Sequence, residues 1–164
     1  MTISHYDKNG EYEVLERFQE MVRLSKGMGK KRVLQDDAIQ RTLQALSHFR
    51  SALLKYPDIK LRAVATAAVR QASNREVFLE KFKSLMKKPL EVISGVQEAY
   101  YDYLGIVETL PIEDCLIMDT GGASTEIVLV RGRKDQHAVS LPMGAVNISE
   151  RFLEATVFLL CLYL

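Results

Sequence analysis

Residues 119–126 combine the groups that bind phosphate together with a divalent cation. Their sequence is DTGGASTE, in which one acid ends an apolar run, small residues follow, and a second acid begins the next apolar run. The backbone amides of such a turn can form a nest for a phosphate group. Asp119 and Glu126 supply the carboxylate oxygens that Mg²⁺ prefers. The alternative is a tight hairpin whose glycines supply only turn geometry, because a glycine-rich turn alone is a weak signal.

Two further segments each carry one side chain suited to phosphate chemistry. In residues 94–99 (SGVQEA), Glu98 falls in the first turn of an expected helix, where it would orient and deprotonate a water molecule. An acid at that position is also common because it stabilises the helix dipole. In residues 65–74 (ATAAVRQASN), Arg70 would grip a phosphate through its planar guanidinium group. Its alternative is an ordinary surface cation.

The other reactive residue types show no pattern that favours metal or nucleophilic chemistry. The basic run in residues 26–32 is a solvated loop or a track for a polyanion. The histidines lack metal-ligand spacing and neither cysteine has a CxxC partner, which argues against zinc binding and cysteine catalysis. We assign the cysteines to packing. The residues concerned are His5, His48, His137, Cys115 and Cys161.

Composition narrows the class of protein. The 164 residues carry 22 Lys and Arg against 21 Asp and Glu, and this near-neutral balance argues against a general nucleic-acid binder. Two cysteines cannot make a disulfide framework, the N-terminal residues do not resemble a signal peptide, and the apolar run 155–164 is too short to span a bilayer. We therefore expect a cytoplasmic protein with no membrane partner.

The first two thirds of the chain alternate strands with helices. Residues 2–6 and 12–22 flank Asn9 and Gly10, the strongest short hairpin signal. Helical spacing of apolar residues over 36–56, with Asp36 or Asp37 as N-cap, predicts the first helix. Short apolar strands at 60–66 and 90–94 precede a helix opened by the capping-box pattern of 73–76 and a helix over 97–104. This order predicts βαβ units with a parallel sheet, whose ligands lie at the carboxyl ends of strands.

The last third begins a new pattern. Strands are expected at 115–119, 126–130 and 137–141, and they form a meander. We place a domain boundary near residues 109–111, so that residues 1–109 form one domain and residues 110–164 begin a second one.

Several segments, in this order and spacing, resemble the exopolyphosphatase and guanosine pentaphosphate phosphohydrolase (Ppx/GppA) family of the sugar kinase, heat-shock protein 70 and actin superfamily. The resemblance covers residues 20–152 and implies an α/β fold of actin-like, ribonuclease H-like domains. The matching segments are MVRLSKGMG (21–29), ATAAVRQASN (65–74), VISGVQEA (92–99), DTGGASTEIV (119–128) and SLPMGAVNISERF (140–152).

The resemblance implies hydrolysis of a terminal phosphoanhydride, with release of orthophosphate from polyphosphate or from guanosine pentaphosphate. Carried over by position, Glu98 is the catalytic base, Asp119 is the metal-associated acid, and Glu126 is a second essential acid that shares the Mg²⁺ ion. Amides and cations would offset the charge of the transferring phosphoryl group. The residues that would bind phosphate are Arg70, Gly121, Gly122, Ser124 and Thr125.

The chain also departs from the family pattern. Ala123 replaces a usual glycine, and its methyl group would crowd the phosphate or forbid a positive φ. The family's first strand, with its acid-Gly-Ser-Asn-Ser phosphate loop, has no counterpart, and residues 155–164 are atypically apolar. We therefore expect a fragment with little activity, truncated at both ends, whose complete relatives form homodimers.

Two other functions remain open from the sequence. One is a non-catalytic module that binds polyphosphate or guanosine tetraphosphate through Arg70 and the turn at 121–124. The other is a sugar or carboxylate kinase of the same superfamily, against which the VISGVQEA segment argues because it resembles the phosphohydrolase branch.

Overall fold

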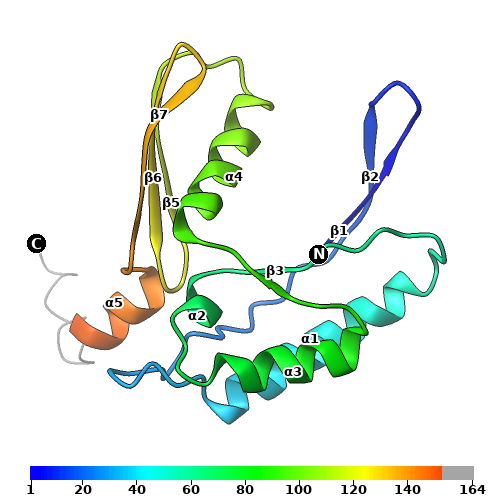
Figure 1. Cartoon of the computed structure of the whole chain (residues 1–164), viewed down its shortest axis with the longest axis vertical. Coiled ribbons are helices and arrows are strands. Elements are labelled where there is room, and N and C mark those ends of the chain that lie inside the picture. Colours follow the sequence, from blue (N-terminus) through cyan, green and yellow to red (C-terminus); the bar gives the residue numbers. More distant parts are fainter. Residues whose placement is uncertain (153–164) are drawn as a thin grey trace, which may run out of the picture.

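The computed structural model describes residues 1–152, and an antiparallel hairpin opens the chain (Figure 1). Strands β1 (Thr2–Tyr6) and β2 (Tyr12–Arg17) pair across a turn in which Gly10 has a φ of +86°. The hairpin prediction is confirmed, although β2 ends five residues earlier than expected. The predicted apolar tail, residues 155–164, lies outside the described residues.

Helices α1 (Asp36–Leu53) and α3 (Arg75–Met86) pack side by side over an apolar core that includes Leu34, Ile39 and Phe78. Both predicted caps are wrong. The α1 N-cap is Gln35, which puts both aspartates inside the first turn, where they favour the helix dipole. The α3 N-cap, Asn74, makes no capping bond, because its amide side chain bonds both backbone groups of Leu34.

A parallel strand pair links these helices to the candidate site. Strands β3 (Val64–Ala65) and β4 (Glu91–Val92) are shorter than predicted, but they pair in parallel as expected of a βαβ unit. After β3 comes the short helix α2 (Ala67–Arg70), which the sequence reading missed. After β4 comes α4 (Gly95–Val107), which is longer than predicted and begins with a Ser94–Gln97 capping box.

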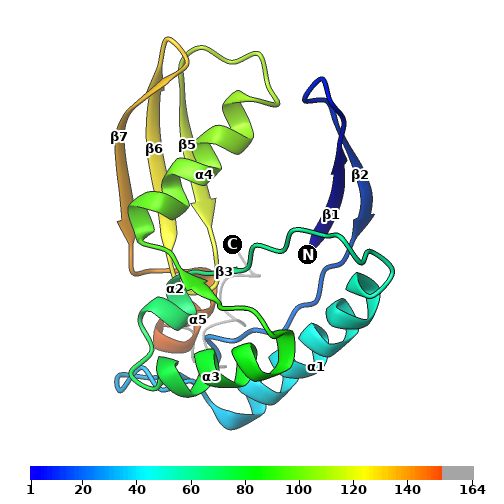
Figure 2. The ribbon, with the colours of Figure 1, turned by 45° about the vertical axis from the view of Figure 1, so that its right-hand side comes forward.

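The predicted meander is confirmed as strands β5 (Cys115–Thr120), β6 (Thr125–Arg131) and β7 (Lys134–Leu141). Helix α4 covers one face of this sheet and buries Ala99 against Val128 and Val130. Helix α5 (Ala145–Phe152) lies at the foot of the strands (Figure 2). The boundary predicted near residues 109–111 falls directly after α4, a helix that packs on strands beyond it, and the domain division stays a prediction.

Helices α1 and α3 form the base of the molecule, and both the β1–β2 hairpin and the layer of α4 with β5–β7 stand on that base (Figures 1 and 2). Helix α2, the start of α4 and the turn between β5 and β6 lie where that layer meets the base. The α/β fold class predicted from the sequence is confirmed. Within residues 1–152, no helix has both the length and the apolarity needed to cross a membrane.

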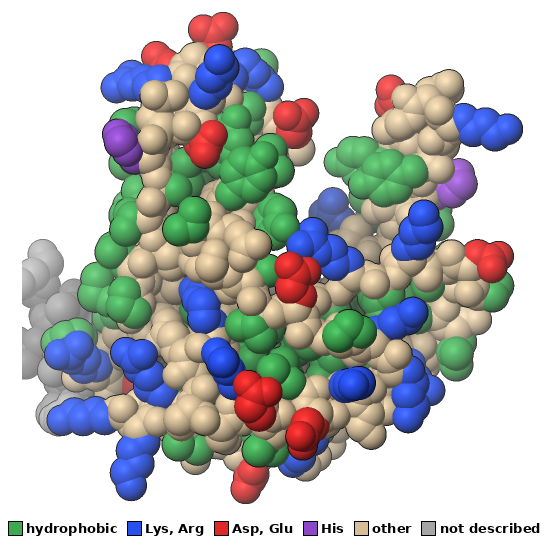
Figure 3. Space-filling model, in the orientation of Figure 1, with side chains coloured by type: hydrophobic (Ala, Val, Ile, Leu, Met, Phe, Trp, Pro, Cys, Tyr) green, Lys and Arg blue, Asp and Glu red, His purple; other side chains and the backbone are tan. Residues whose placement is uncertain are grey.

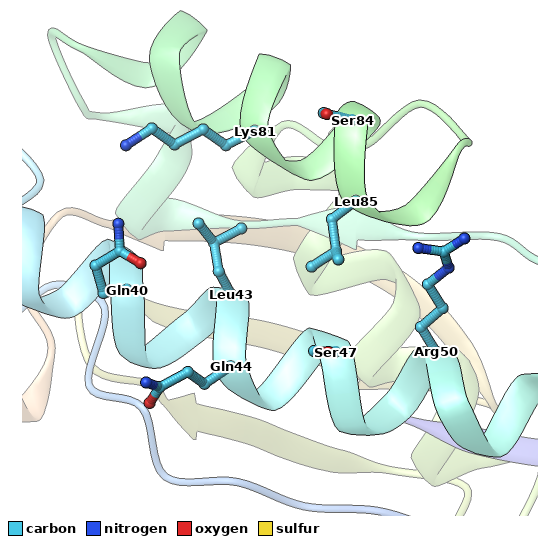
Figure 4. Close-up of a pocket in the computed structure, with 8 residues that line it drawn as sticks. All are labelled: Gln40, Leu43, Gln44, Ser47, Arg50, Lys81, Ser84 and Leu85. Atoms are coloured by element: carbon cyan, nitrogen blue, oxygen red, sulfur yellow. The ribbon is translucent and has the colours of Figure 1, made fainter.

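An open groove runs between α1 and α3 (Figure 4). Leu43 and Leu85 lie across it from each other, and Arg50 and Lys81 lie toward its ends. None of the residues predicted for phosphate chemistry lines this groove, so it is separate from the candidate site.

Candidate active site

The turn at residues 121–124 joins β5 to β6, and the carbonyl groups on its first half point toward α5. The amides of Ala145 and Val146, which open α5, donate to the carbonyl oxygens of Gly121 and Gly122 at 2.8 and 3.0 Å. The Gln71 side chain, directly after α2, donates to the carbonyl oxygen of Ala123 at 3.3 Å. The turn is therefore held by two helices through its oxygens.

Three amides of the same turn lack a hydrogen-bond partner within the part of the chain that the structure describes. Among residues 1–152, the backbone N–H groups of Gly122, Ala123 and Ser124 have no hydrogen-bond acceptor. Ala123 and Ser124 are buried, and buried amides without a partner are rare in folded proteins. Successive amides without an acceptor in a turn are one feature of a phosphate nest, and phosphate binding here stays a prediction.

The backbone angles of the turn and its contacts show which of its small residues the structure requires. No residue of 121–124 has a positive φ, so the conformation that the methyl group of Ala123 would forbid is not required in this turn. A Cβ atom on Gly122 would lie 3.1 Å from Ser25 Oγ, so glycine here permits a close approach of the loop that contains Ser25. Thr125, at the end of the turn, donates its hydroxyl to the carbonyl oxygen of Met143 at 2.6 Å.

Arg70 and Glu98 meet beside this turn. Arg70 Nη1 donates to Glu98 Oε2 at 3.0 Å and to the carbonyl oxygen of Ile93 at 2.9 Å. Their side chains are only 22% and 16% exposed, so neither is an ordinary surface group. Because Gln71 bonds the turn and its neighbour Arg70 bonds Glu98, α2 connects the predicted base to the predicted phosphate nest.

Glu126 is the most deeply placed acid of the site. It is 2% exposed and accepts a hydrogen bond of 2.7 Å from Ser140, the residue opposite it on β7. Asp119 lies opposite Glu126 on β5, so both side chains lie on the face of the sheet that α4 covers. Ser140 in turn contacts the start of α4, because a Cβ atom on Gly95 would lie 2.4 Å from Ser140 Cβ.

Asp102 lies near these acids, although it was not predicted as a site residue from the sequence. Its Oδ2 atom is buried and is the one such side-chain oxygen or nitrogen in residues 1–152 that has no hydrogen-bond partner. Burial, followed by the negative charges of Asp119, Glu126 and Glu98, raises the pKa of Asp102 to about 6. The sequence feature that could have identified Asp102 is its spacing, because it follows Glu98 by four residues and so lies on the same face of α4.

We expect the Asp102→Asn variant to remove a pH dependence of folding. Because the pKa is raised in the folded protein, ionisation of Asp102 lowers the free energy of unfolding as the pH rises from about 4 to about 6. The Asp102 side chain is only half-buried, so solvent screening reduces the effect, and at pH 7.5 the variant should be more stable by about 1 kcal/mol. Below about pH 4 the two proteins should match. Urea unfolding at both pH values measures the free energy of unfolding of the variant and the wild type, with the exposed Asp135→Asn variant as control. If the variant and the wild type differ equally at both pH values, the prediction is wrong.

The acids fit a divalent cation through oxygen ligands. No group of three or more His, Cys, Asp or Glu side chains in residues 1–152 is placed to hold one metal ion. Mg²⁺, however, commonly takes one or two carboxylates and completes its shell with water and substrate phosphates. Asp119 and Glu126 lie opposite each other on β5 and β6 and on one face of the sheet, so they supply such a pair. Their role as ligands stays a prediction.

Known proteins match most of the length of this chain. The sequence model described as the Ppx/GppA phosphatase family matches residues 3–159. A guanosine-5'-triphosphate,3'-diphosphate pyrophosphatase of Vibrio parahaemolyticus is 36% identical over 153 residues, which are 93% of this chain and 30% of that relative. A protein of the same name from Pseudoalteromonas atlantica is 36% identical over 143 residues, covering 87% of this chain and 28% of the relative.

Solved structures share the fold as well. An exopolyphosphatase from Cytophaga hutchinsonii matches with a TM-score of 0.87 at 28% identity, over 93% of this chain and 49% of that one. A Ppx/GppA family member from Aquifex aeolicus matches with a TM-score of 0.73 at 34% identity, over 93% and 50%. The chain thus spans less than a third of the curated relatives and about half of these structures. Since the family model matches nearly its whole length, the chain belongs to the Ppx/GppA phosphatase family.

Proposed function

We propose that this chain carries the reaction centre of a phosphoanhydride hydrolase, which releases terminal orthophosphate from inorganic polyphosphate or guanosine pentaphosphate. Family membership supports the reaction class, and the names of the relatives support the two substrates. The observation that carries the proposal is the position of α2, whose end bonds both Glu98 and the turn with its unpartnered amides.

Each residue has a distinct part in the reaction. The terminal phosphate lies against the amides of residues 122–124, and Arg70 shares its guanidinium between that phosphate and Glu98. Glu98 orients a water molecule and takes its proton as the water oxygen attacks phosphorus. The anhydride bond then breaks, and the substrate shortened by one phosphate leaves as an anion. The amides and Arg70 offset the charge on the transferring group.

A magnesium ion would assist at the same place. Asp119 and Glu126 would hold it, and it would supply positive charge to the phosphate oxygens. The Ser140 hydroxyl keeps the Glu126 carboxylate oriented from the other side.

Replacing Arg70 by glutamine tests whether this site binds phosphate. We expect affinity for guanosine tetraphosphate to fall about tenfold or more, because a charge-assisted contact contributes about 1.5–3 kcal/mol. Calorimetry measures the change, and exposed Arg50→Gln on α1 is the matched control. Equal affinities in the wild type and the Arg70 variant contradict the placement. If the wild type binds guanosine pentaphosphate tightly but releases no orthophosphate from it, the chain is instead a binding module.

A further inference from the structure

The loop of residues 23–32 carries an unusual concentration of unpaired positive charge. Its sequence is RLSKGMGKKR, and no acid occurs anywhere from residue 21 to residue 35. All five cations are exposed, and none of them forms a salt bridge within the part of the chain that the structure describes. They are Arg23, Lys26, Lys30, Lys31 and Arg32. Such a run concentrates a positive potential over one strip of surface.

This loop begins at the phosphate nest. Ser25 Oγ is the atom that a Cβ on Gly122 would approach to 3.1 Å, so the loop touches the turn itself. Two residues later, the amide of Gly27 donates to Glu150 of α5 at 2.8 Å. The loop passes the foot of α5 (Figure 1), and Lys and Arg side chains gather on that part of the surface (Figure 3).

The backbone of this loop has a defined conformation that positions the cations. Arg23 and Arg32, at the two ends of the loop, have φ values of 48° and 51°, which cost free energy in residues other than glycine. Successive turns fold the segment, and the carbonyl oxygen of Arg32 accepts a bond of 2.8 Å from the amide of Ser73. Ser73 lies three residues after Arg70, the last residue of α2, so the loop is bonded to the segment that leaves the helix carrying Arg70.

We propose that the loop of residues 23–32 binds the phosphates of a linear polyphosphate chain that lie beyond the one held in the turn at 121–124. This inference rests on the proposed function, and it favours long polyphosphate over guanosine pentaphosphate as the better bound substrate. A polyphosphate chain carries charge at every unit and extends along a row of cations. The loop has no aromatic residue on which a base could stack, which argues against single-stranded nucleic acid as the ligand.

Neutralising the loop tests the proposal. The Lys30→Gln/Lys31→Gln variant is compared with Lys83→Gln/Lys88→Gln, which removes two exposed lysines from α3 and the segment after it. Binding is measured by calorimetry for long-chain polyphosphate, tripolyphosphate and oligouridylate, each at low and high potassium chloride. Because two exposed ion contacts are lost, long-chain affinity should fall about fivefold to tenfold in the loop variant and its salt dependence should flatten. The control variant should bind as the wild type does.

The outcomes separate this inference from the function beneath it. Tripolyphosphate affinity should change less than that of the long chain, since the short ligand is held mainly at the turn. Equal losses in both lysine variants, unchanged long-chain affinity, or equally tight oligouridylate binding would overturn the loop as a polyphosphate site and leave the hydrolase proposal standing. If no phosphate ligand binds the wild-type protein, both proposals are wrong.

Discussion

Glutamine at position 98 should slow orthophosphate release about a thousandfold while phosphate ligands continue to bind. Glu98 is the carboxylate that Arg70 holds at 3.0 Å beside the turn, and no other predicted role is assigned to it. Loss of a general base costs about 10²–10⁴-fold in rate, so we expect about a thousandfold decrease. Glutamine has nearly the same shape and leaves Arg70 free for phosphate, so affinity for guanosine tetraphosphate should stay equal or increase.

The assay needs protein in excess over substrate, so that a single slow turnover is visible. Glu91→Gln is the matched control, because Glu91 is also paired with an arginine, Arg62, at 3.0 Å, but is exposed and lies before α4. That control should keep the wild-type rate. If the Glu98 variant retains a rate within tenfold of the wild type, Glu98 is not the base.

Alanine at position 144 should have the largest effect on the structure of the site. A Cβ atom there would lie 2.4 Å from the amide nitrogen of Ala123 and 2.6 Å from the carbonyl oxygen of Gly121. These are backbone atoms of the phosphate turn, which cannot move aside as a flexible side chain can. We expect the free energy of unfolding to fall by about 3 kcal/mol, because overpacking of this kind costs about 1–3 kcal/mol even where side chains can adjust.

The Gly144→Ala variant should also lose phosphate binding. Displacement of the turn from α5 would break the bonds from Ala145 and Val146 that orient its amides. Gly105→Ala is the control, since a Cβ at this position in α4 meets nothing within 4 Å. A helix-interior alanine there should stabilise the protein by about 0.5–1 kcal/mol. Wild-type stability and binding in the Gly144 variant, measured by urea unfolding and calorimetry, would contradict the packing described here.

Strong local patterns made much of the fold predictable. The Asn9–Gly10 hairpin and the β5–β7 meander follow from turn residues between β-compatible runs, and both are confirmed. Tertiary contacts decided the rest. The predicted strand at 60–66 pairs over only two residues, and Asn74 bonds Leu34 in place of capping α3. Short helices such as α2 have too few residues for a period to be visible.

The acids and glycines of the candidate site stand out in the sequence, whereas the residues that support them do not. Glu98, Glu126 and the small residues at 121–124 stand out by type and spacing, and the structure places them around α2 and α4. Ser140 becomes visible only through the register that sets it opposite Glu126, and Gly144 only through the packing of α5 against the turn. Such partners lie far apart in sequence, so local spacing cannot identify them.

Phosphorus NMR of guanosine pentaphosphate mixed with the protein in heavy-oxygen water is the most direct test of the hydrolase proposal. The account predicts guanosine tetraphosphate and orthophosphate in equal amounts, with one heavy oxygen atom in each orthophosphate formed, and no product with the Glu98→Gln variant. A nucleotide that binds but stays intact, or a phosphoryl group that appears on an acceptor other than water, would contradict it.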